Sequence, residues 1–164
     1  MSFIADLTPD PESKAPALRL VEKPRSSERA WTIDILLVDD DEADCSLILS
    51  ALRGDPRVNN VTATNAPDAV LFDIATGRVR PNLILLDIHM PRLSGFKFLE
   101  ALRRIPRMDA TPVVFLTTSR FARDVAQARA ASAHSYIVKP ESYAELKAKL
   151  EAVVEAAVTD AWSR

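Results

Sequence analysis

Glycine, cysteine and histidine are all scarce in this chain of 164 residues, and each scarcity excludes a class of site. The three glycines, Gly54, Gly77 and Gly95, are too far apart to form the glycine-rich loops that bind phosphate in nucleotide-binding proteins. The single cysteine, Cys45, cannot form an internal disulfide, so we expect a reducing, cytoplasmic setting. One cysteine and two histidines are also too few for a zinc site with the usual number of ligands.

Long apolar runs and an excess of basic charge are also absent. No run approaches the roughly 20 residues needed to span a bilayer, and the N-terminus lacks the basic and apolar regions of a signal peptide. Lys and Arg number 21 against 23 Asp and Glu, which gives a net charge of −2. This balance argues against a nucleic-acid-binding surface. We therefore expect neither a membrane nor a nucleic acid as a partner.

The residues that are present suffice for one domain. With 48% hydrophobic and 27% charged residues, the chain can bury a core and stay in solution. Residues 1–30 contain four of the eleven prolines and show little periodicity, so we expect a flexible tail there. Residues 31–164 are predicted to form the domain, which ends in an extended C-terminal helix.

Short apolar runs alternate with segments of helical periodicity from Trp31 onward. The runs are rich in Val, Ile and Leu, which is typical of strands covered on both faces of a parallel sheet. The predicted strands are 33–38, 58–64, 83–86, 113–116 and 136–138. The predicted helices are 43–53, 66–76, 95–105, 121–131 and 142–161. Five repeats of strand and helix predict a doubly wound α/β fold with right-handed crossovers.

Several helix ends carry a residue that favours them. Gly54 and Gly77 follow the first two helices, where a C-terminal glycine is common. Asn65 stands where the N-cap of the second helix is expected. Ser142 and Glu145 have the spacing of a capping box at the start of the last helix.

Polar side chains follow four of the five predicted strands. They are Asp39, Asp40 and Asp41 after the first strand, Asp87 after the third, Thr117 at the end of the fourth and Lys139 after the fifth. The carboxyl ends of parallel strands lie along one edge of a sheet, where such folds bind their ligands. We therefore expect residues up to a hundred positions apart in the chain to meet in one crevice.

Each of these residues has an ordinary explanation when taken alone. A carboxylate before a helix can be a cap, and a lysine before a proline is usually a solvated surface residue. Together, however, the carboxylates would repel one another unless a cation or protons intervened. Carboxylate oxygens suit Mg²⁺, and a lysine with a hydroxyl group suits a phosphoryl group. This combination favours a carboxylate that carries a phosphoryl group as an acyl phosphate.

Separated blocks of the sequence resemble the receiver domain of bacterial two-component response regulators. The blocks are LLVDDD at 36–41, LLDIHMPRLSG at 85–95, VFLTTS at 114–119 and YIVKP at 136–140. The resemblance extends over about residues 33–155, in the order and spacing of the family. It implies a flavodoxin-like doubly wound (βα)5 fold with a five-stranded parallel sheet in the order 2-1-3-4-5.

The resemblance also implies the phosphoacceptor and its metal site. Asp87 is expected to accept a phosphoryl group from the phosphohistidine of a sensor histidine kinase. Asp40, with Asp39 through a water molecule, is expected to hold Mg²⁺ together with Asp87 and the backbone carbonyl of His89.

Three further residues are implied to respond to phosphorylation. Lys139 is expected to contact the phosphoryl oxygens, and Thr117 to move toward them. Tyr136 is expected to follow by changing rotamer. The change would then reach the face formed by the fourth helix, fifth strand and fifth helix, as expected for a switch driven by added charge.

Two positions depart from the family pattern. His89 stands where receivers often have Asn or another polar residue. It is either a solvent-facing loop histidine or a side chain that overhangs the phosphoryl group and tunes its hydrolysis. The turn before Tyr136 lacks the glycine that is common there, so we expect Ser132 or His134 to adopt a mildly strained backbone conformation.

The expected partners are proteins. Only 24 residues follow Pro140, so we expect a stand-alone receiver that is a phosphoacceptor and not an enzyme. Details of the loops and Trp162 resemble small regulators paired with phytochrome-type sensor kinases. The last helix could support a homodimer, or Trp162 could fold back on its own domain. The sequence does not identify the downstream partner.

Three other functions are compatible with parts of the pattern. A degenerate receiver would bind partners without phosphorylation, although all the expected site residues are present. A phosphatase of the haloacid dehalogenase type needs a second aspartate where this chain has His89. A flavodoxin-like nucleotide binder would need a phosphate loop after the first strand, which the sequence lacks.

Overall fold

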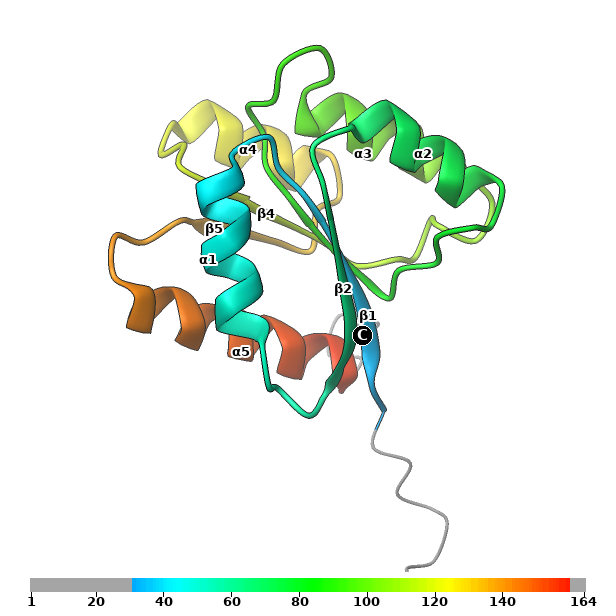
Figure 1. Ribbon diagram of the computed structural model, residues 1–164. Helices are drawn as coiled ribbons and strands as arrows, with labels where there is room; N and C mark the ends of the chain where they lie inside the picture. The colour runs from blue at the N-terminus through cyan, green and yellow to red at the C-terminus, as the bar shows by residue number, and fades with distance from the viewer. Residues whose placement is uncertain (1–30, 160–164) are drawn as a thin grey trace, which may run out of the picture.

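Five parallel strands form a sheet in residues 31–159, the part of the chain that the computed structural model describes (Figure 1). The strands are β1 (Ile33–Val38), β2 (Val58–Thr64), β3 (Leu83–Leu86), β4 (Val113–Thr117) and β5 (Ser135–Val138). The helices are α1 (Glu42–Leu52), α2 (Pro67–Ala75), α3 (Gly95–Arg103), α4 (Ala122–Ala130) and α5 (Tyr143–Val158). The strand order β2-β1-β3-β4-β5 confirms the predicted fold class. The predicted tail of residues 1–30 and Trp162 lie outside the described residues.

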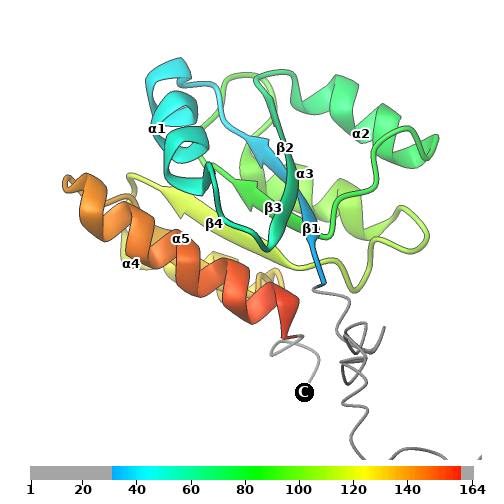
Figure 2. The same cartoon turned by 60° about the horizontal axis from the view of Figure 1, so that its bottom comes forward.

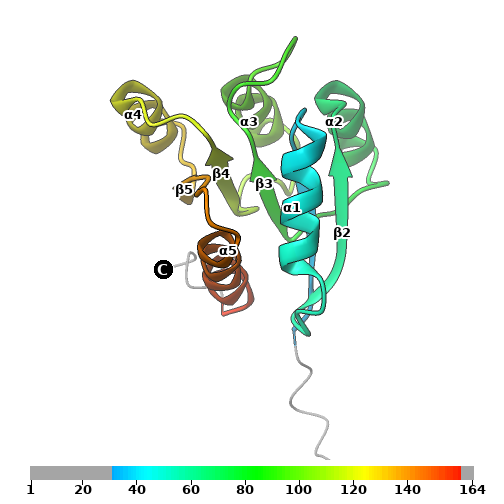
Figure 3. The same cartoon turned by 60° about the vertical axis from the view of Figure 1, so that its left-hand side comes forward.

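The helices cover both faces of the sheet. Helices α1 and α5 lie side by side on one face, and α2, α3 and α4 cover the other (Figures 2 and 3). Successive strand residues alternate between the two layers, as the period of two requires. On β1, Ile35 and Leu37 pack toward α1 and α5, whereas Leu36 and Val38 pack toward α2 and α3. Each face of the sheet therefore has its own apolar core.

The central strands are buried on both faces, but the edge strands are not. Every residue of β3 and β4 is buried, as are all but one of β1. The prediction of coverage on both faces is wrong for β2, where Asn59 and Asn60 are exposed and Val58 and Val61 only half-buried. Strand β5 is half-buried throughout. Both lie at an edge of the sheet, where they pair with one neighbouring strand instead of two.

Most helix ends form as expected, to within a few residues. Gly54 and Gly77 follow the C-caps of α1 and α2 with φ angles of +83° and +74°, in the left-handed region that glycine tolerates. The Ser142 hydroxyl accepts a hydrogen bond from the Glu145 N–H at the start of α5. Predicted and observed ends differ because the hydrogen bonds of terminal turns fray, which the apolar pattern does not reveal.

The start of α2 corrects one prediction. Ala66, not Asn65, is the N-cap residue, and it makes no side-chain capping hydrogen bond. Instead, the Ala66 N–H donates to the hydroxyl of Thr64, at the end of β2. Pro67 in the first turn has no N–H, so one of the donors that a cap would serve is missing.

The turn between α4 and β5 forms without glycine. Ser132 has a φ of +60°, which confirms the expected strain at one of the two named positions. The backbone N–H of His134 donates to the Val113 carbonyl at 2.8 Å, and its Nδ1 accepts from the Val113 N–H at 3.2 Å. His134 therefore joins the start of β5 to β4 through both its backbone and its ring.

The free energy of unfolding is expected to fall as the pH drops through about 6.5, because of His134. Burial, and then the charge of Arg103, lower the pKa of His134 from its usual 6.5. Just below pH 6.5 the unfolded chain therefore binds a proton that the folded protein excludes, so stability is lost as the pH falls. Urea unfolding of the wild type and of His134→Asn, which keeps an acceptor, measures this effect. Equal pH slopes would contradict it.

The helices of residues 31–159 are all too short or too polar to cross a membrane.

Candidate functional site

The carboxyl ends of four strands meet at one edge of the sheet. Val38 pairs with Leu86 in register, and the Asp87 N–H donates to the Val38 carbonyl at 2.9 Å. On the other side, the Lys139 N–H donates to the Thr117 carbonyl at 2.8 Å. These backbone bonds bring together the polar residues that the sequence places at strand ends.

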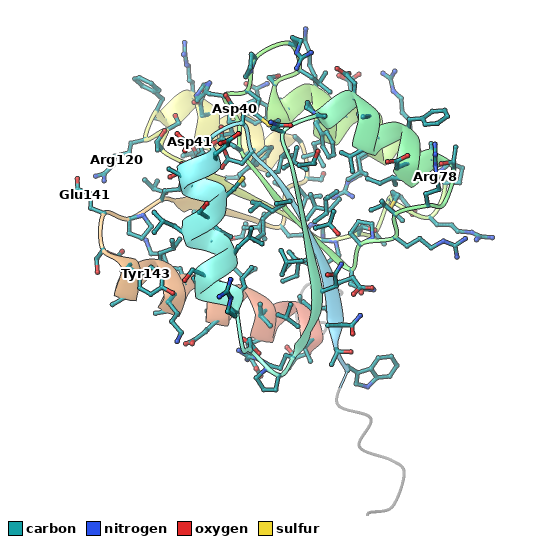
Figure 4. All side chains as sticks on the ribbon, viewed as in Figure 1. Asp40, Asp41, Arg78, Arg120, Glu141 and Tyr143 are labelled. Atoms are coloured by element: carbon teal, nitrogen blue, oxygen red, sulfur yellow. The ribbon has the colours of Figure 1, made fainter. Side chains whose placement is uncertain are left out.

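The three consecutive aspartates after β1 have different roles. Asp39 is 1% exposed, whereas Asp40 and Asp41 are exposed at the start of α1 (Figure 4). Asp41 is the N-cap of α1, and its carboxylate accepts the Asp44 N–H at 2.9 Å. Asp41 is therefore a helix cap, as the ordinary explanation expects, whereas Asp39 and Asp40 are not used for capping α1.

Three carboxylates come close enough to share a cation. Asp39, Asp40 and Asp87 each offer an oxygen within 4.8 Å of the others. Two of these residues are buried, and like charges so placed repel unless a cation balances them. A few carboxylate oxygens with one solvent-exposed side fit Mg²⁺, which keeps several water ligands. The ligand role of the His89 carbonyl stays a prediction, although the His89 N–H donates to Asp87 Oδ2 at 3.1 Å.

Lys139 balances part of this negative charge. Its Nζ lies 2.6 Å from Asp39 Oδ2, 2.6 Å from Asp44 Oδ2 and 3.9 Å from Asp87 Oδ1. Burial alone would lower the pKa of Lys139, but the hydrogen bonds to Asp39 and Asp44 outweigh it and raise the pKa. Burial also raises the pKa of Asp39 by more than Lys139 lowers it. Asp44 was not among the residues expected from the sequence, because its contact with Lys139 spans 95 residues and depends on how α1 packs.

Thr117 and Tyr136 both contact Ser119, in the loop between β4 and α4. Thr117 is fully buried, and its hydroxyl accepts the Ser119 N–H at 3.3 Å. The Tyr136 hydroxyl donates to the Ser119 carbonyl at 2.9 Å. Burial raises the pKa of Tyr136, so its hydroxyl stays protonated near neutral pH. The movements expected of Thr117 and Tyr136 stay predictions, but one loop residue joins the two side chains.

His89 contacts a buried carboxylate on α4. Its Nε2 lies 3.1 Å from Asp124 Oδ2, and Ser119 donates its hydroxyl to the same oxygen at 2.5 Å. The hydrogen bond from Ser119, followed by that from His89, lowers the pKa of Asp124. The His89 side chain is 54% exposed, so it is both a surface residue and a link between the loop after β3 and the first turn of α4. Neither sequence interpretation of His89 included this contact.

Replacing Asp124 with alanine is expected to lower the free energy of unfolding by about 1–3 kcal/mol, because it leaves the buried Ser119 hydroxyl without its acceptor. The matched control is Asp73→Ala, which removes the exposed pair of Asp73 with Arg78 and is expected to cost less than about 1 kcal/mol. Urea unfolding of both variants measures the difference. Equal losses would show that the Asp124 contacts contribute no more than a surface pair.

Comparison with known proteins identifies the family. A model of the response regulator receiver domain matches residues 35–151. The chain is 33% identical over 125 residues to the probable methanogenesis regulatory protein FilR2 of Methanothrix harundinacea. The alignment includes 74% of this chain and 81% of FilR2. It is 35% identical over 120 residues to the transcriptional regulatory protein AfsQ1 of Streptomyces coelicolor. That alignment includes 73% of this chain and 50% of AfsQ1. It spans half or less of several other curated relatives.

Solved structures show the same similarity. The phosphorylated cyanobacterial phytochrome response regulator RcpA is 27% identical, with a TM-score of 0.71 over 79% of this chain and 96% of that one. The Mn²⁺-bound response regulator Rcp1 is 28% identical, with a TM-score of 0.65 over 74% and 91% of the two chains. The sheet order, the cluster of acidic residues and the family match agree, and the chain belongs to the response regulator receiver family.

Proposed function

We propose that this receiver accepts a phosphoryl group on Asp87 and thereby switches its contacts with other proteins. One observation carries the proposal: the carboxylates of Asp39, Asp40 and Asp87 and the ammonium of Lys139 converge at one edge of the sheet. Such a site offers a nucleophile, oxygen ligands for a cation and a positive charge for phosphoryl oxygens.

Asp39, Asp40 and Asp87 would hold Mg²⁺, with the His89 carbonyl as the further ligand and Asp39 acting through water. When bound, the ion would neutralise charge that develops on the transferred phosphoryl group. The fit rests on the oxygen donors and their mutual distances of at most 4.8 Å. The Mn²⁺-bound state of the similar Rcp1 supports a divalent cation in this family.

The transfer itself needs little beyond position and charge. An oxygen of Asp87 forms a bond to phosphorus while the bond from phosphorus to the donor's imidazole nitrogen breaks. The imidazole leaves as the neutral ring because its other nitrogen already carries a proton. Lys139, 3.9 Å from Asp87 Oδ1, provides positive charge beside the incoming group. The protein supplies no general base for this step, since the Asp87 carboxylate is already a nucleophile.

The response would pass through Ser119. The Thr117 hydroxyl would move toward a phosphoryl oxygen on Asp87. Because this hydroxyl accepts a hydrogen bond from the Ser119 N–H, its movement would also displace Ser119. Tyr136 is bound to the carbonyl of the same residue. Movement of this loop would therefore reach α4, β5 and α5, which present the responding face.

The proposed donor is a sensor histidine kinase. The similarity to RcpA and Rcp1 makes a phytochrome-type kinase our specific proposal.

We also propose that α5 pairs two copies of the protein, because Tyr143 on α5 and Leu47 on α1 expose apolar surface. Light scattering over a concentration series, with and without a phosphoryl mimic, tests the dimer, and a monomer throughout would remove it.

One experiment separates this function from its alternatives. The protein is incubated with Mg²⁺ and a small phosphodonor, and its intact mass is measured. We expect one phosphate adduct that hydroxylamine removes and that Asp87→Asn lacks. Release of many phosphates per protein molecule would favour a phosphatase instead. No adduct, and no response to a phosphoryl mimic, would favour a degenerate receiver.

A further inference from the structure

Carboxylates from two different elements hold Lys139. Its Nζ donates to Asp39 Oδ2 and to Asp44 Oδ2, both at 2.6 Å, whereas Asp87 Oδ1 is 3.9 Å away. The side chain of Lys139 is only 10% exposed, so these contacts are made away from bulk water. An ammonium group has three donors. Two of them are occupied by Asp39 and Asp44, and neither is directed at the proposed phosphoacceptor.

Asp44 differs from Asp39 in its other contacts. Asp39 belongs to the acidic cluster and accepts the Asp41 N–H at 2.9 Å. Asp44 lies in the first turn of α1, where its own N–H is held by the Asp41 carboxylate. Its side chain is 30% exposed, against 1% for Asp39. Of the two partners of Lys139, Asp44 is thus the one that can exchange its ammonium contact for water.

We propose that Asp44 is a positioning residue that competes with the phosphoryl group on Asp87 for Lys139. This inference rests on the proposed function, since it requires that group. Asp44 accepts a hydrogen bond from a Lys139 N–H that could otherwise donate to a phosphoryl oxygen. Its charge also offsets the positive charge that Lys139 presents to an anion. When Asp87 is phosphorylated, the ammonium exchanges Asp44 for a phosphoryl oxygen, and no covalent bond beyond the phosphotransfer changes.

Asp44 should therefore weaken the interaction between Lys139 and a phosphoryl group on Asp87. Replacing it with asparagine removes the charge but keeps the size of the side chain. Asp44→Asn is therefore expected to bind beryllium trifluoride, a phosphoryl mimic, about twofold to fivefold more tightly than the wild type, the size of one partly exposed ionic contact. Calorimetric titration at saturating Mg²⁺ measures this, so that differences in metal affinity do not contribute.

The matched control is Glu42→Gln. Glu42 is an exposed residue in the same turn of α1, and its carbonyl accepts the Ser46 hydroxyl, a contact that this substitution preserves. It removes the same charge without touching Lys139. Asp44→Glu, which keeps the charge, is expected to restore nearly wild-type affinity. In a Lys139→Met background, Asp44→Asn is expected to have little effect, because the residue through which it acts is gone.

The outcomes are distinct. Tighter binding by Asp44→Asn than by both the wild type and Glu42→Gln supports the competition. If Asp44→Asn matches Glu42→Gln, or binds more weakly than the wild type, the competition is overturned while the phosphoacceptor function stands. If the wild type itself does not bind the mimic, the proposed function fails, and the role of Asp44 fails with it.

Discussion

Replacing Lys139 with methionine is expected to lower the free energy of unfolding by about 3–5 kcal/mol at neutral pH, the usual cost of breaking a buried ion pair. Asp39 is 1% exposed and lies 2.6 Å from the Lys139 ammonium. Methionine has a similar length but no charge, so it leaves a buried carboxylate without its cation. Urea unfolding in the absence of divalent cations measures the loss.

The pH dependence of this loss identifies its cause. Burial already raises the pKa of Asp39, and without Lys139 nothing there opposes burial as strongly. A carboxyl group whose pKa is raised on folding binds a proton more readily in the folded protein, so stability is regained as the pH falls. The cost of Lys139→Met should therefore be smaller near pH 5 than near pH 8. A cost independent of pH would point to lost packing instead.

Lys149→Met is the control for removing a lysine as such. Lys149 lies 2.9 Å from Glu145 one turn away on α5, and their side chains are 38% and 55% exposed. Such surface pairs contribute about 0.3–0.5 kcal/mol. A loss for Lys139→Met that is no larger than this would contradict the account of Lys139 as the cation that balances Asp39.

Replacing Gly95 with alanine is expected to cost about 3–5 kcal/mol, or to prevent folding, because the added atom has no room. A Cβ at Gly95 would lie 2.2 Å from the carbonyl oxygen of Asp87 and 3.0 Å from the Phe115 ring. The obstacle is backbone, which cannot rotate away as a side chain can. Either α3 or the Asp87 loop must shift, so any folded variant should also form the phosphate adduct more slowly.

Gly54→Ala separates this steric effect from backbone strain. Gly54 has a φ of +83°, but nothing lies within 4 Å of the atom that alanine would add. Only the conformational penalty applies there, about 1–2 kcal/mol. Thermal and urea unfolding of the two variants compare the effects directly. A Gly95→Ala protein as stable as Gly54→Ala would show that α3 moves aside at little cost.

The fold could be predicted because local patterns and topology agree. Apolar runs in β1, β3 and β4, interrupted in β1 only by Asp34, indicate buried parallel strands, and the structure buries their apolar residues. The apolar pattern says less about β2, where the exposed Asn59 and Asn60 separate the half-buried Val58 and Val61. Position at the edge of a sheet is a property of the whole topology, and the apolar runs do not encode it.

The site was predictable where residues directly follow strands. Asp39, Asp87 and Lys139 are brought together by strand order alone, since parallel strands deliver their ends to one edge. Asp44 and Asp124 lie on helices, and their side chains reach the site only because of how those helices rotate and pack. Their contacts with Lys139 and His89 span 95 and 35 residues of sequence, and no local spacing indicates them.

The most direct test of Asp87 as the phosphoacceptor is chemical mapping of the modified residue. The protein is phosphorylated with Mg²⁺ and a small phosphodonor, and borohydride then reduces the acyl phosphate to an alcohol. Peptide mass spectrometry is expected to find homoserine at position 87 and aspartate at positions 39 and 40. Homoserine at position 39 or 40 instead, or unreduced aspartate at all three, would contradict the assignment of Asp87.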